Sequence, residues 1–322
     1  MDNLTISYHR TSRFGQYGNV IRQRLDMRIA TWNVNSLKAR LEKVQWWLER
    51  ARPDVLLMQE TKLADADAPV EAFRDAGYEF AHHGEGRWNG VAIASRIGIS
   101  GIVTNFGEPL RPARTPDAAD AADDEPLAEA RMISAECGGI RLVCVYAPNG
   151  RLVGSPFYEA KLVWFRRLAQ WLEKTIPAGA PIVLGGDLNV APADIDVWDP
   201  RACHGGTHVS EPERDAFAAL CRAGLVDAYR LRHPEADRYT WWDYRAGNFH
   251  KNFGMRIDHL LVSTALTPRI ISSEIDREAR KGKPLPSDHA PLAIDLDHPG
   301  HPFDAGWASA DQRVAGRRAK LG

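Results

Sequence analysis

The amino-acid sequence predicts an α+β fold, a layered sandwich of strands and helices in one large folded unit. Segments with strand character outnumber those with helix character, and many neighbouring strands are separated by only a few residues. This spacing favours the layered class over a strictly parallel βαβ sheet. The chain has 322 residues, of which 44 % are hydrophobic and 26 % charged, which is enough for a sizeable core.

The regular pattern begins at Met27, where residues 27–33 alternate as a half-buried strand does. Ser36 can cap a following helix that Pro53 ends. The apolar stripe of that helix consists of Leu37, Leu41, Val44, Trp47 and Leu48. The continuous apolar run at 54–58 is typical of a buried strand.

The same criteria predict two further helices, at 155–176 and 213–223. Strands are expected at 90–95, 99–104, 131–137, 141–146, 181–185, 239–242, 256–263, 269–275 and 291–296. The predominance of short strands over helices is the basis of the layered α+β prediction.

Three segments lack such a pattern. Residues 1–26 are polar, and we expect a flexible N-terminal extension that could reflect start-site choice. Residues 111–130 are rich in Ala, Asp and Pro, which predicts an acidic surface-loop insertion. Residues 298–322 turn from Pro and Gly to basic side chains, and we expect a loosely held tail. The predicted folded domain therefore spans 27–297.

The net charge of −1 is unusual for a protein that binds nucleic acid. However, residues 117–129 hold six acids and no base, so the rest of the chain is net positive. Net charge thus neither supports nor excludes a nucleic-acid partner. The acidic segment is either a solvated insertion or an electrostatic gate against non-specific binding.

Compartment and assembly are predicted from what the sequence lacks. No apolar stretch is long enough for a membrane helix, and no secretory signal is visible. The four cysteines (Cys137, Cys144, Cys203 and Cys221) show no metal-site spacing, so we expect reduced, buried thiols in a cytoplasmic protein. No feature requires more than a monomer.

Four polar islands lie at the ends of predicted strands. They are 32–35 (WNVN), 59–62 (QETK), 185–189 (GGDLN) and 287–291 (SDHAP). Because loops on a rigid scaffold carry most catalytic groups, these islands are candidate site residues.

Phosphoryl transfer is the chemistry that needs this set of residues. Mg²⁺ prefers carboxylate and water oxygens, and Asp187 could accept a proton from an attacking water or orient it. Asn33 and Asn189 can donate hydrogen bonds without adding negative charge beside a phosphate. A protonated His289 could offset charge on the phosphoryl oxygens, with Asp258 as its acid partner.

Each island alone has a simpler explanation. An acid after a strand is often a solvated cap, and Gly-Gly-Asp is a common turn. Asp258 could be a structural acid paired with an arginine, and His289 an ordinary loop histidine. The prediction depends on all four islands occurring together in this order.

Seven motifs across the predicted domain carry a closer resemblance. They are 29–41 (IATWNVNSLKARL), 57–63 (LMQETKL), 145–150 (VYAPNG), 185–192 (GGDLNVAP), 239–244 (YTWWDY), 256–258 (RID) and 287–289 (SDH). In this order they resemble the exonuclease III family of apurinic/apyrimidinic endonucleases, within the endonuclease/exonuclease/phosphatase superfamily. The resemblance implies a four-layer α/β sandwich, with two packed mixed β-sheets flanked by helices.

The resemblance also implies a metal site. Glu60 resembles the principal ligand of Mg²⁺, with Mn²⁺ as an alternative ion. Asn33 and Asn35 resemble residues on the water or phosphate shell of the metal, and Asp288 resembles an acid near it.

The catalytic roles are implied in the same way. Asp187 resembles the residue that activates the attacking water, and Asn189 the residue that positions it. His289 resembles a phosphate-contacting histidine that is oriented by Asp258. Tyr146 resembles a group that contacts the scissile phosphate or the leaving oxygen.

Substrate contacts follow from the same resemblance. Asn149 also resembles a residue at the scissile phosphate, and Trp241 matches an aromatic position against the abasic sugar, although a core tryptophan would also fit a strand. Phosphate contacts are expected from basic residues at the mouth of the site, namely Lys62, Arg87, Arg151, Arg245 and Lys251.

The implied function is hydrolysis of the phosphodiester 5′ to an abasic site in duplex DNA, with 3′→5′ exonuclease or 3′-phosphatase activity at 3′ ends. One alternative keeps the superfamily and changes the substrate to RNA, a phosphoinositide or another phosphoester. A second is a non-catalytic DNA-binding scaffold. That alternative predicts the loss of a catalytic position, yet the chain retains Glu60, Asp187, Asn189, Asp258 and His289.

Overall fold

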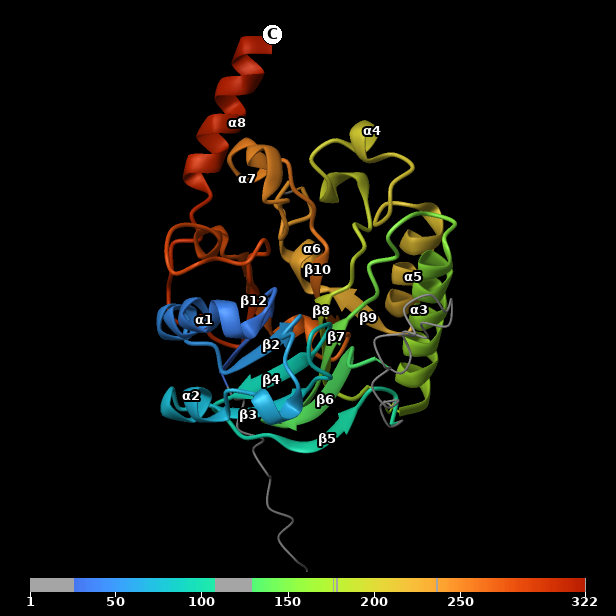
Figure 1. Cartoon of the computed structure of the whole chain (residues 1–322), viewed down its shortest axis with the longest axis vertical. Coiled ribbons are helices and arrows are strands. Elements are labelled where there is room, and N and C mark those ends of the chain that lie inside the picture. The colour runs from blue at the N-terminus through green and yellow to red at the C-terminus, as the bar shows by residue number, and fades with distance from the viewer. Residues whose placement is uncertain (1–25, 108–128, 176, 178, 236, 322) are drawn as a thin grey trace, which may run out of the picture.

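Two six-stranded sheets packed face to face, with helices outside each, form the body of the protein (Figure 1). The structure is a computed structural model that describes residues 26–107, 129–175, 177, 179–235 and 237–321. The four-layer α+β prediction is confirmed. Nearly all of the predicted N-terminal extension, and the acidic segment up to residue 128, lie outside the described residues.

The first sheet has the strand order β11-β12-β1-β2-β4-β3. β1 and β2 are parallel and the other neighbours are antiparallel, so the sheet is mixed. The bounds are β1 (Met27–Asn33), β2 (Val55–Gln59), β3 (Glu79–His83), β4 (Val91–Ser95), β11 (Ile270–Ile275) and β12 (Leu292–Leu296).

The second sheet repeats this arrangement in the order β5-β6-β7-β8-β10-β9. Here β7 and β8 form the parallel pair. The bounds are β5 (Ser100–Thr104), β6 (Met132–Cys137), β7 (Ile140–Tyr146), β8 (Ile182–Asp187), β9 (Leu225–Asp227) and β10 (Asp258–Ser263).

The facing sides of the two sheets enclose the central core. Ile29 and Leu57 of the first sheet belong to the same buried cluster as Leu142, Val183 and Leu260 of the second. Almost every residue of β1, β2, β7, β8 and β10 is buried because helices cover the outer faces. Strands buried on both sides read as continuous apolar runs, which explains why these segments were recognisable in the sequence.

Helices close both outer faces. α1 (Leu37–Ala51) lies on the first sheet, where Val44 and Trp47 pack against Ala30 and Leu56. The Ser36 hydroxyl accepts from the Ala39 N–H, as expected for a cap. The second sheet is covered by α3 (Pro156–Thr175) and α5 (Glu211–Arg222). The remaining helices are α2 (Val70–Asp75), α4 (Pro200–Cys203), α6 (Ala228–Arg232), α7 (Asn248–Lys251), α8 (Ala308–Leu321) and the 3₁₀ turns Asp65–Asp67, Asp194–Asp196, Arg245–Gly247, Thr267–Arg269 and Arg277–Arg280.

The predicted strand at 239–242 is wrong. Trp241 forms only isolated bridges, to Met255 and His289, and its neighbours join no sheet. The Thr240 hydroxyl instead accepts from the Ile257 N–H and the backbone N–H that follows it. The aromatic run is therefore a loop across the sheet ends, and its apolar character reflects packing rather than strand pairing.

Part of the chain beyond residue 297 belongs to the core. The domain boundaries themselves remain a prediction. Trp307 is buried in the central cluster and donates from Nε1 to the Ile275 carbonyl at 2.8 Å. α8 follows directly and lies beside α7 (Figure 1).

All four cysteines are free in the described structure. Cys137 and Cys144 are buried, whereas Cys203 and Cys221 are half-buried, so the predicted burial holds for two of them. Burial raises the pKa of Cys144 to about 12. None of the described helices combines the length and apolar character needed to cross a bilayer.

Candidate active site

The topology brings the four polar islands to one edge of the sandwich. The parallel pairs end together, with Asn33 opposite Gln59 in the first sheet and Tyr146 opposite Asp187 in the second. β10 runs antiparallel to β8, so its first residue, Asp258, also lies opposite Asp187. Because β1 packs against β8 and β10, these strand ends meet across the sandwich.

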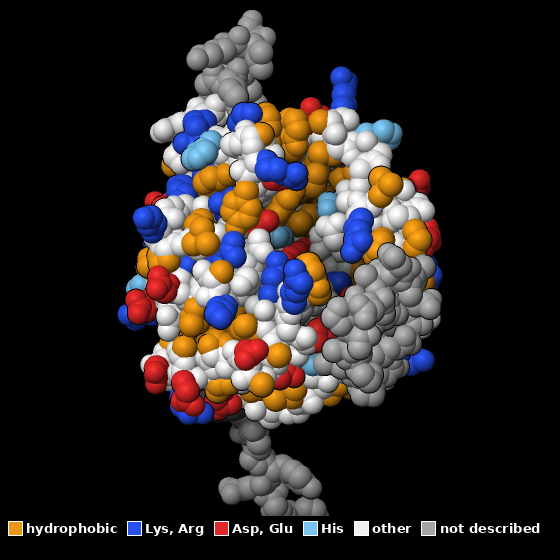
Figure 2. All heavy atoms as spheres, in the orientation of Figure 1, with side chains coloured by type: hydrophobic (Ala, Val, Ile, Leu, Met, Phe, Trp, Pro, Cys, Tyr) orange, Lys and Arg blue, Asp and Glu red, His pale blue; other side chains and the backbone are white. Residues whose placement is uncertain are grey.

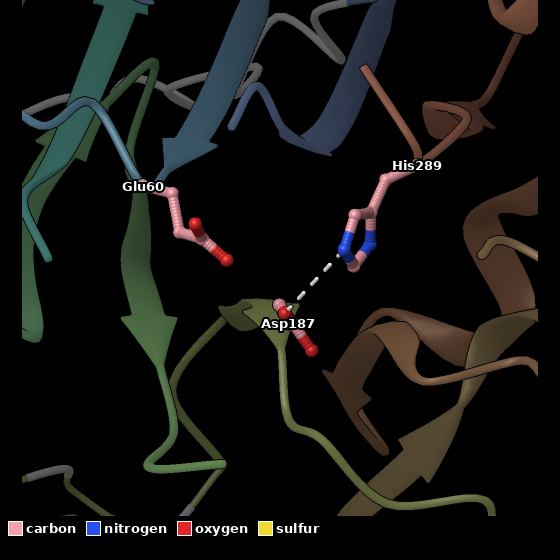
Figure 3. Close-up of side chains that lie close together, drawn as sticks. All are labelled: Glu60, Asp187 and His289. Atoms are coloured by element: carbon pink, nitrogen blue, oxygen red, sulfur yellow. Dashed lines mark ion pairs between the residues drawn. The ribbon is translucent and has the colours of Figure 1, made fainter. Parts of the chain in front are cut away.

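Glu60, Asp187 and His289 converge from three segments that are distant in sequence (Figure 3). Asn33 links two of them, since its Nδ2 donates to Glu60 Oε1 at 2.8 Å and to Asp187 Oδ2 at 2.9 Å. Although burial favours the neutral acid, Lys62 and Asn33 donate to the carboxylate and lower the pKa of Glu60. Glu60 is therefore held as an anion at this edge.

Asp187 is buried, and each of its carboxylate oxygens accepts a hydrogen bond. The Asn189 N–H donates to Asp187 Oδ1 at 2.9 Å, while Asn33 occupies Oδ2. Burial raises the pKa of Asp187, and the adjacent Asp258 carboxylate raises it further, to about 7, against the opposing effect of His289. A carboxyl group with this pKa can exchange a proton near neutral pH.

His289 and Asp258 form a buried pair. The His289 Nδ1 lies 2.8 Å from Asp258 Oδ2, and its Nε2 lies 3.9 Å from Asp187 Oδ2. Burial opposes charge on the ring, but Asp258 and then Asp187 outweigh it and raise the pKa of His289 to about 10. The ring is thus a cation whose Nε2–H faces the site.

A second set of contacts surrounds Asn35. Its Nδ2 donates to Asp288 Oδ1 at 2.9 Å, and its Oδ1 accepts from Lys62 Nζ at 2.6 Å. Trp241 donates from Nε1 to the other Asp288 oxygen at 3.1 Å, which places this indole at the site. The Lys62 ammonium also lies 2.8 Å from Glu60 Oε2.

Tyr146 and Asn149 form the opposite side of the site. The Tyr146 hydroxyl is hydrogen-bonded to Glu60, and burial together with this carboxylate raises the pKa of the phenol well above its usual range. Asn149 Nδ2 donates to Asn189 Oδ1 at 3.3 Å. A pocket of about 190 Å³ opens here, lined by Tyr146, Asn149 and Arg151 among others.

Lys161, a buried residue that was not identified from the sequence, joins the loop that contains Asn149 to the loop that contains Asn189. Lys161 Nζ donates to the Asn189 carbonyl at 2.7 Å and the Asn149 carbonyl at 3.3 Å, and is paired with Glu213. His208 Nδ1 lies 2.6 Å from the same Asn189 carbonyl. The sequence did contain an indication of this pair, because Lys161 lies on the apolar, buried face of α3. A lysine in such a position needs an acidic or carbonyl partner.

Several site residues adopt left-handed backbone geometry. The φ angles are 44° at Asn35, 52° at Glu60, 53° at Lys62 and 51° at Asn189. Non-glycine residues held at positive φ cluster where the surrounding structure fixes a functional arrangement. In this chain they turn the side chains after β1, β2 and β8 toward one another.

The donor set fits a hard divalent cation. Glu60, Asp187 and His289 offer ligand atoms within 4.8 Å of one another, so this group could hold a metal ion. A protonated His289 has no free lone pair, so the oxygens are the better ligands. The Lys62 ammonium, which bridges Glu60 Oε2 and Asn35 Oδ1, shows that these oxygens already favour positive charge.

The predicted basic contacts are dispersed. Lys62 lies in the site and Arg151 stacks on the Phe157 ring near its edge. Arg245 is 86 % exposed and paired with Asp243, and no described contact joins it to the acidic cluster. Arg87 and Lys251 lie over the aromatic rings of Trp88 and Phe253. Figure 2 shows Lys and Arg side chains around a central depression in which acidic and histidine side chains are visible.

Position 186, directly before Asp187 in β8, has room only for glycine. A Cβ there would lie 1.8 Å from the Val145 carbonyl oxygen, which is backbone of the paired strand β7. We expect Gly186→Ala to lower the free energy of unfolding by about 1–3 kcal/mol, because β7 and β8 must separate. Urea denaturation measures this, and an unchanged midpoint would contradict the close approach.

Comparison with known proteins adds an independent finding. A family model described as Endonuclease/Exonuclease/phosphatase family matches residues 30–289. Exodeoxyribonuclease III of Haemophilus influenzae is 32 % identical over 278 residues, which cover 83 % of this chain and 98 % of that protein. An AP endonuclease from Archaeoglobus fulgidus superposes with a TM-score of 0.76 at 35 % identity, covering 84 % of this chain and all of that chain. The 3′ phosphatase NExo from Neisseria, bound to product DNA hairpin, gives a TM-score of 0.75 at 37 % identity, with the same coverage.

Proposed function

Because this chain belongs to the endonuclease/exonuclease/phosphatase family, we propose that it is a DNA repair nuclease that hydrolyses the phosphodiester 5′ to abasic sites in duplex DNA. The observation that carries the proposal is the convergence of Glu60, Asp187 and the His289–Asp258 pair at one sheet edge. Relatives named exodeoxyribonuclease III and AP endonuclease support the choice of substrate.

We infer that the metal is Mg²⁺, which Glu60 would hold, with Asp288 nearby and Asn33 and Asn35 able to contact its water or phosphate ligands. Glutamate and aspartate oxygens are the ligands that Mg²⁺ prefers, and Mn²⁺ can use the same set. When bound, such an ion neutralises phosphate charge and lowers the barrier to attack by water. With an ion at Glu60, the Lys62 ammonium, now 2.8 Å from Glu60 Oε2, would be available to a phosphate oxygen.

In the proposed reaction Asp187 accepts the proton of the attacking water. Its pKa of about 7 suits a group that must take a proton and release it again. Asn189 is fixed by its N–H bond to Asp187 and by donation from Nδ2 to the Ala147 carbonyl at 3.0 Å. This places its amide oxygen where it can orient the same water.

His289 stabilises charge on the phosphate in the same proposal. Its Nδ1 is occupied by Asp258, so Nε2–H is the group left to donate to a phosphoryl oxygen. Tyr146 and Asn149 stand on the opposite side and provide a hydroxyl and an amide to the leaving 3′ oxygen or the scissile phosphate. Trp241 closes the site beside Asp288 and packs against the abasic sugar.

The test is cleavage of a labelled duplex with one abasic-site analogue, compared with undamaged duplex DNA, single-stranded DNA and RNA. We expect incision 5′ to the lesion in Mg²⁺, at least ten times slower cleavage of undamaged DNA, and none in EDTA. Incision that persists in EDTA would contradict the metal-dependent site. Cleavage of RNA in preference to all DNA substrates would move the assignment to another phosphoester.

Activity at 3′ ends is a second candidate, and one comparison favours it. A similar solved structure is described as a 3′ phosphatase and another as a 3′-5′ exonuclease, both at 37 % identity. Duplexes with a recessed 3′-phosphate and with a recessed 3′-hydroxyl therefore belong in the same assay. The ratio of initial rates on these ends and on the abasic site ranks the three activities.

A further inference from the structure

A basic pocket lies between the active site and the C-terminal helix, outside the catalytic cluster. Its volume is about 530 Å³. It is lined by Tyr244, Gly247, Phe249, His250, Arg280, Lys281, Gly282, Pro286, Ser309 and Arg313. None of these lining residues is acidic, and two of them belong to α8, beyond the residues matched by the family model.

Arg280 is the central group of this pocket. It is only 7 % exposed, and its guanidinium lies over the rings of Tyr244 and Phe249 at 4.5 and 5.1 Å. Among the described residues, no acceptor bonds its Nε, which is shielded from solvent. A buried guanidinium with an unpaired donor is costly, and an anion in the pocket would offset that cost through its charge.

Further positive charge lies close to Arg280, and the carboxylate that acts on it most strongly is that of Asp288. Arg277 is fully buried, and its Nε and Nη1 also have no described partner, while Nη2 donates to the Phe249 carbonyl. Burial and, after it, the nearby Arg313 together lower the pKa of Arg277 to about 10. Each nearby carboxylate has a partner of its own: Glu278 neutralises Lys281 of the pocket, Asp311 pairs with Arg238, and Asp288 accepts from Asn35 and Trp241. Arg280 and Arg313 are therefore the pocket cations that no described carboxylate pairs with.

The pocket is connected to the catalytic site through one side chain. Arg40 donates from Nη1 to the Asn35 carbonyl at 2.5 Å and from Nη2 to the Tyr244 hydroxyl at 3.2 Å. The Tyr244 hydroxyl in turn donates to the Pro286 carbonyl, two residues before Asp288. A polyanion bound across Asn35 and Asp288 would therefore reach the pocket next.

We propose that this pocket binds a backbone phosphate of the DNA substrate, on the strand that leaves the site past Asn35 and Tyr244. The proposal rests on the proposed function and extends it, because α8 then adds to the substrate surface. Successive phosphates on one strand are about 3.4 Å apart along the helix axis, so a phosphate a few nucleotides from the scissile bond can enter. Arg280 and Arg313 supply the donors, with Ser309 and His250 at the rim.

Binding of a 20-base-pair abasic duplex, measured by fluorescence anisotropy in EDTA, tests the proposal. We expect Arg313→Ala to weaken binding roughly five- to tenfold at 0.1 M salt and to reduce the slope of log K against log salt by about one. Arg222→Ala, an equal change of charge at an exposed position of α5, should leave both unchanged. An unaltered salt slope in Arg313→Ala would overturn the proposal.

Shortened duplexes identify which flank reaches the pocket. Removing nucleotides from one flank should weaken wild-type binding, whereas Arg313→Glu should be insensitive to that truncation and respond normally to truncation of the other flank. Equal responses to both truncations would contradict a discrete phosphate site. A different pair of results is that inorganic phosphate raises the thermal unfolding temperature of the wild type while neither truncation changes DNA binding. That pair would assign the pocket to a free anion and overturn the DNA assignment.

The binding experiment on Arg313→Ala and the incision experiment on the wild type test the two proposals separately. If the wild type incises abasic DNA and Arg313→Ala binds like the wild type, the pocket proposal fails and the function stands. If the wild type incises nothing but the salt slope falls in Arg313→Ala, the function fails and the DNA contact stands.

Discussion

Asp187→Asn should reduce the single-turnover rate of incision by about 10²–10⁴-fold, the range expected when a general base is removed. The carboxylate accepts from Asn33 Nδ2 on one oxygen and from the Asn189 N–H on the other. An asparagine keeps only one of these acceptors, and its own amide group then faces a donor. Both the proton acceptor and the arrangement of its neighbours are lost.

Two controls separate chemistry from folding in this variant. Asp67→Asn makes the same chemical change at an exposed position in the 3₁₀ turn Asp65–Asp67 and should retain wild-type activity. Affinity for the abasic duplex in EDTA should fall less than threefold in Asp187→Asn, since the residue contacts water rather than the DNA backbone in the proposed reaction. A variant with a rate within fivefold of the wild type would show that another group takes the proton.

The sequence predicted the convergence of the site because strand ends are readable. Parallel pairs such as β1 with β2 and β7 with β8 are buried on both faces and appear as apolar runs, after which polar residues stand out. Asp187 and Glu60 were identified on this ground. The contact between His289 and Asp258 spans 31 positions and followed from chemistry alone, as an acid partner for a cationic ring.

The hydrogen-bond and ion-pair partners of polar side chains could not be predicted in the same way. The aromatic run at 239–242 has strand composition, yet Trp241 forms only isolated bridges. The Thr240 hydroxyl accepts from the N–H groups of Ile257 and Asp258, where β10 begins. The basic residues expected at the mouth were also chosen by composition, and Arg245 pairs locally with Asp243. Surface side chains have many partners within reach, so periodicity does not determine where they point.

The buried partner of Lys161 could not be predicted from sequence either, and replacing Lys161 has the largest expected effect on stability. We expect Lys161→Met to lower the free energy of unfolding by about 3–5 kcal/mol, the range found when one partner of a buried ion pair is removed. Both side chains of the Lys161–Glu213 pair are fully buried, so Glu213 would be left as an uncompensated charge. Urea denaturation followed by tryptophan fluorescence measures the change.

The matched control lies on the same helix. Lys174→Met changes the same residue type at an exposed position in the last turn of α3 and should cost less than about 1 kcal/mol. The double variant Lys161→Met with Glu213→Leu removes both charges, and replacing a buried pair by apolar groups is often close to neutral. It should therefore recover part of the lost stability, and a double variant less stable than Lys161→Met would contradict a pairwise origin of the effect.

The rate of DNA incision shows whether the Lys161–Glu213 pair only stabilises the fold or also positions the site. Lys161 holds the Asn149 and Asn189 carbonyls together, so the double variant should unfold at a urea concentration closer to the wild type yet incise DNA more slowly. If Asn189 is displaced, the loss should appear in the rate at saturating DNA rather than in DNA affinity, because its amide orients water and not the backbone. Full activity in the stabilised double variant would mean that the two loops keep their relative position without Lys161, and that the buried pair serves the fold alone.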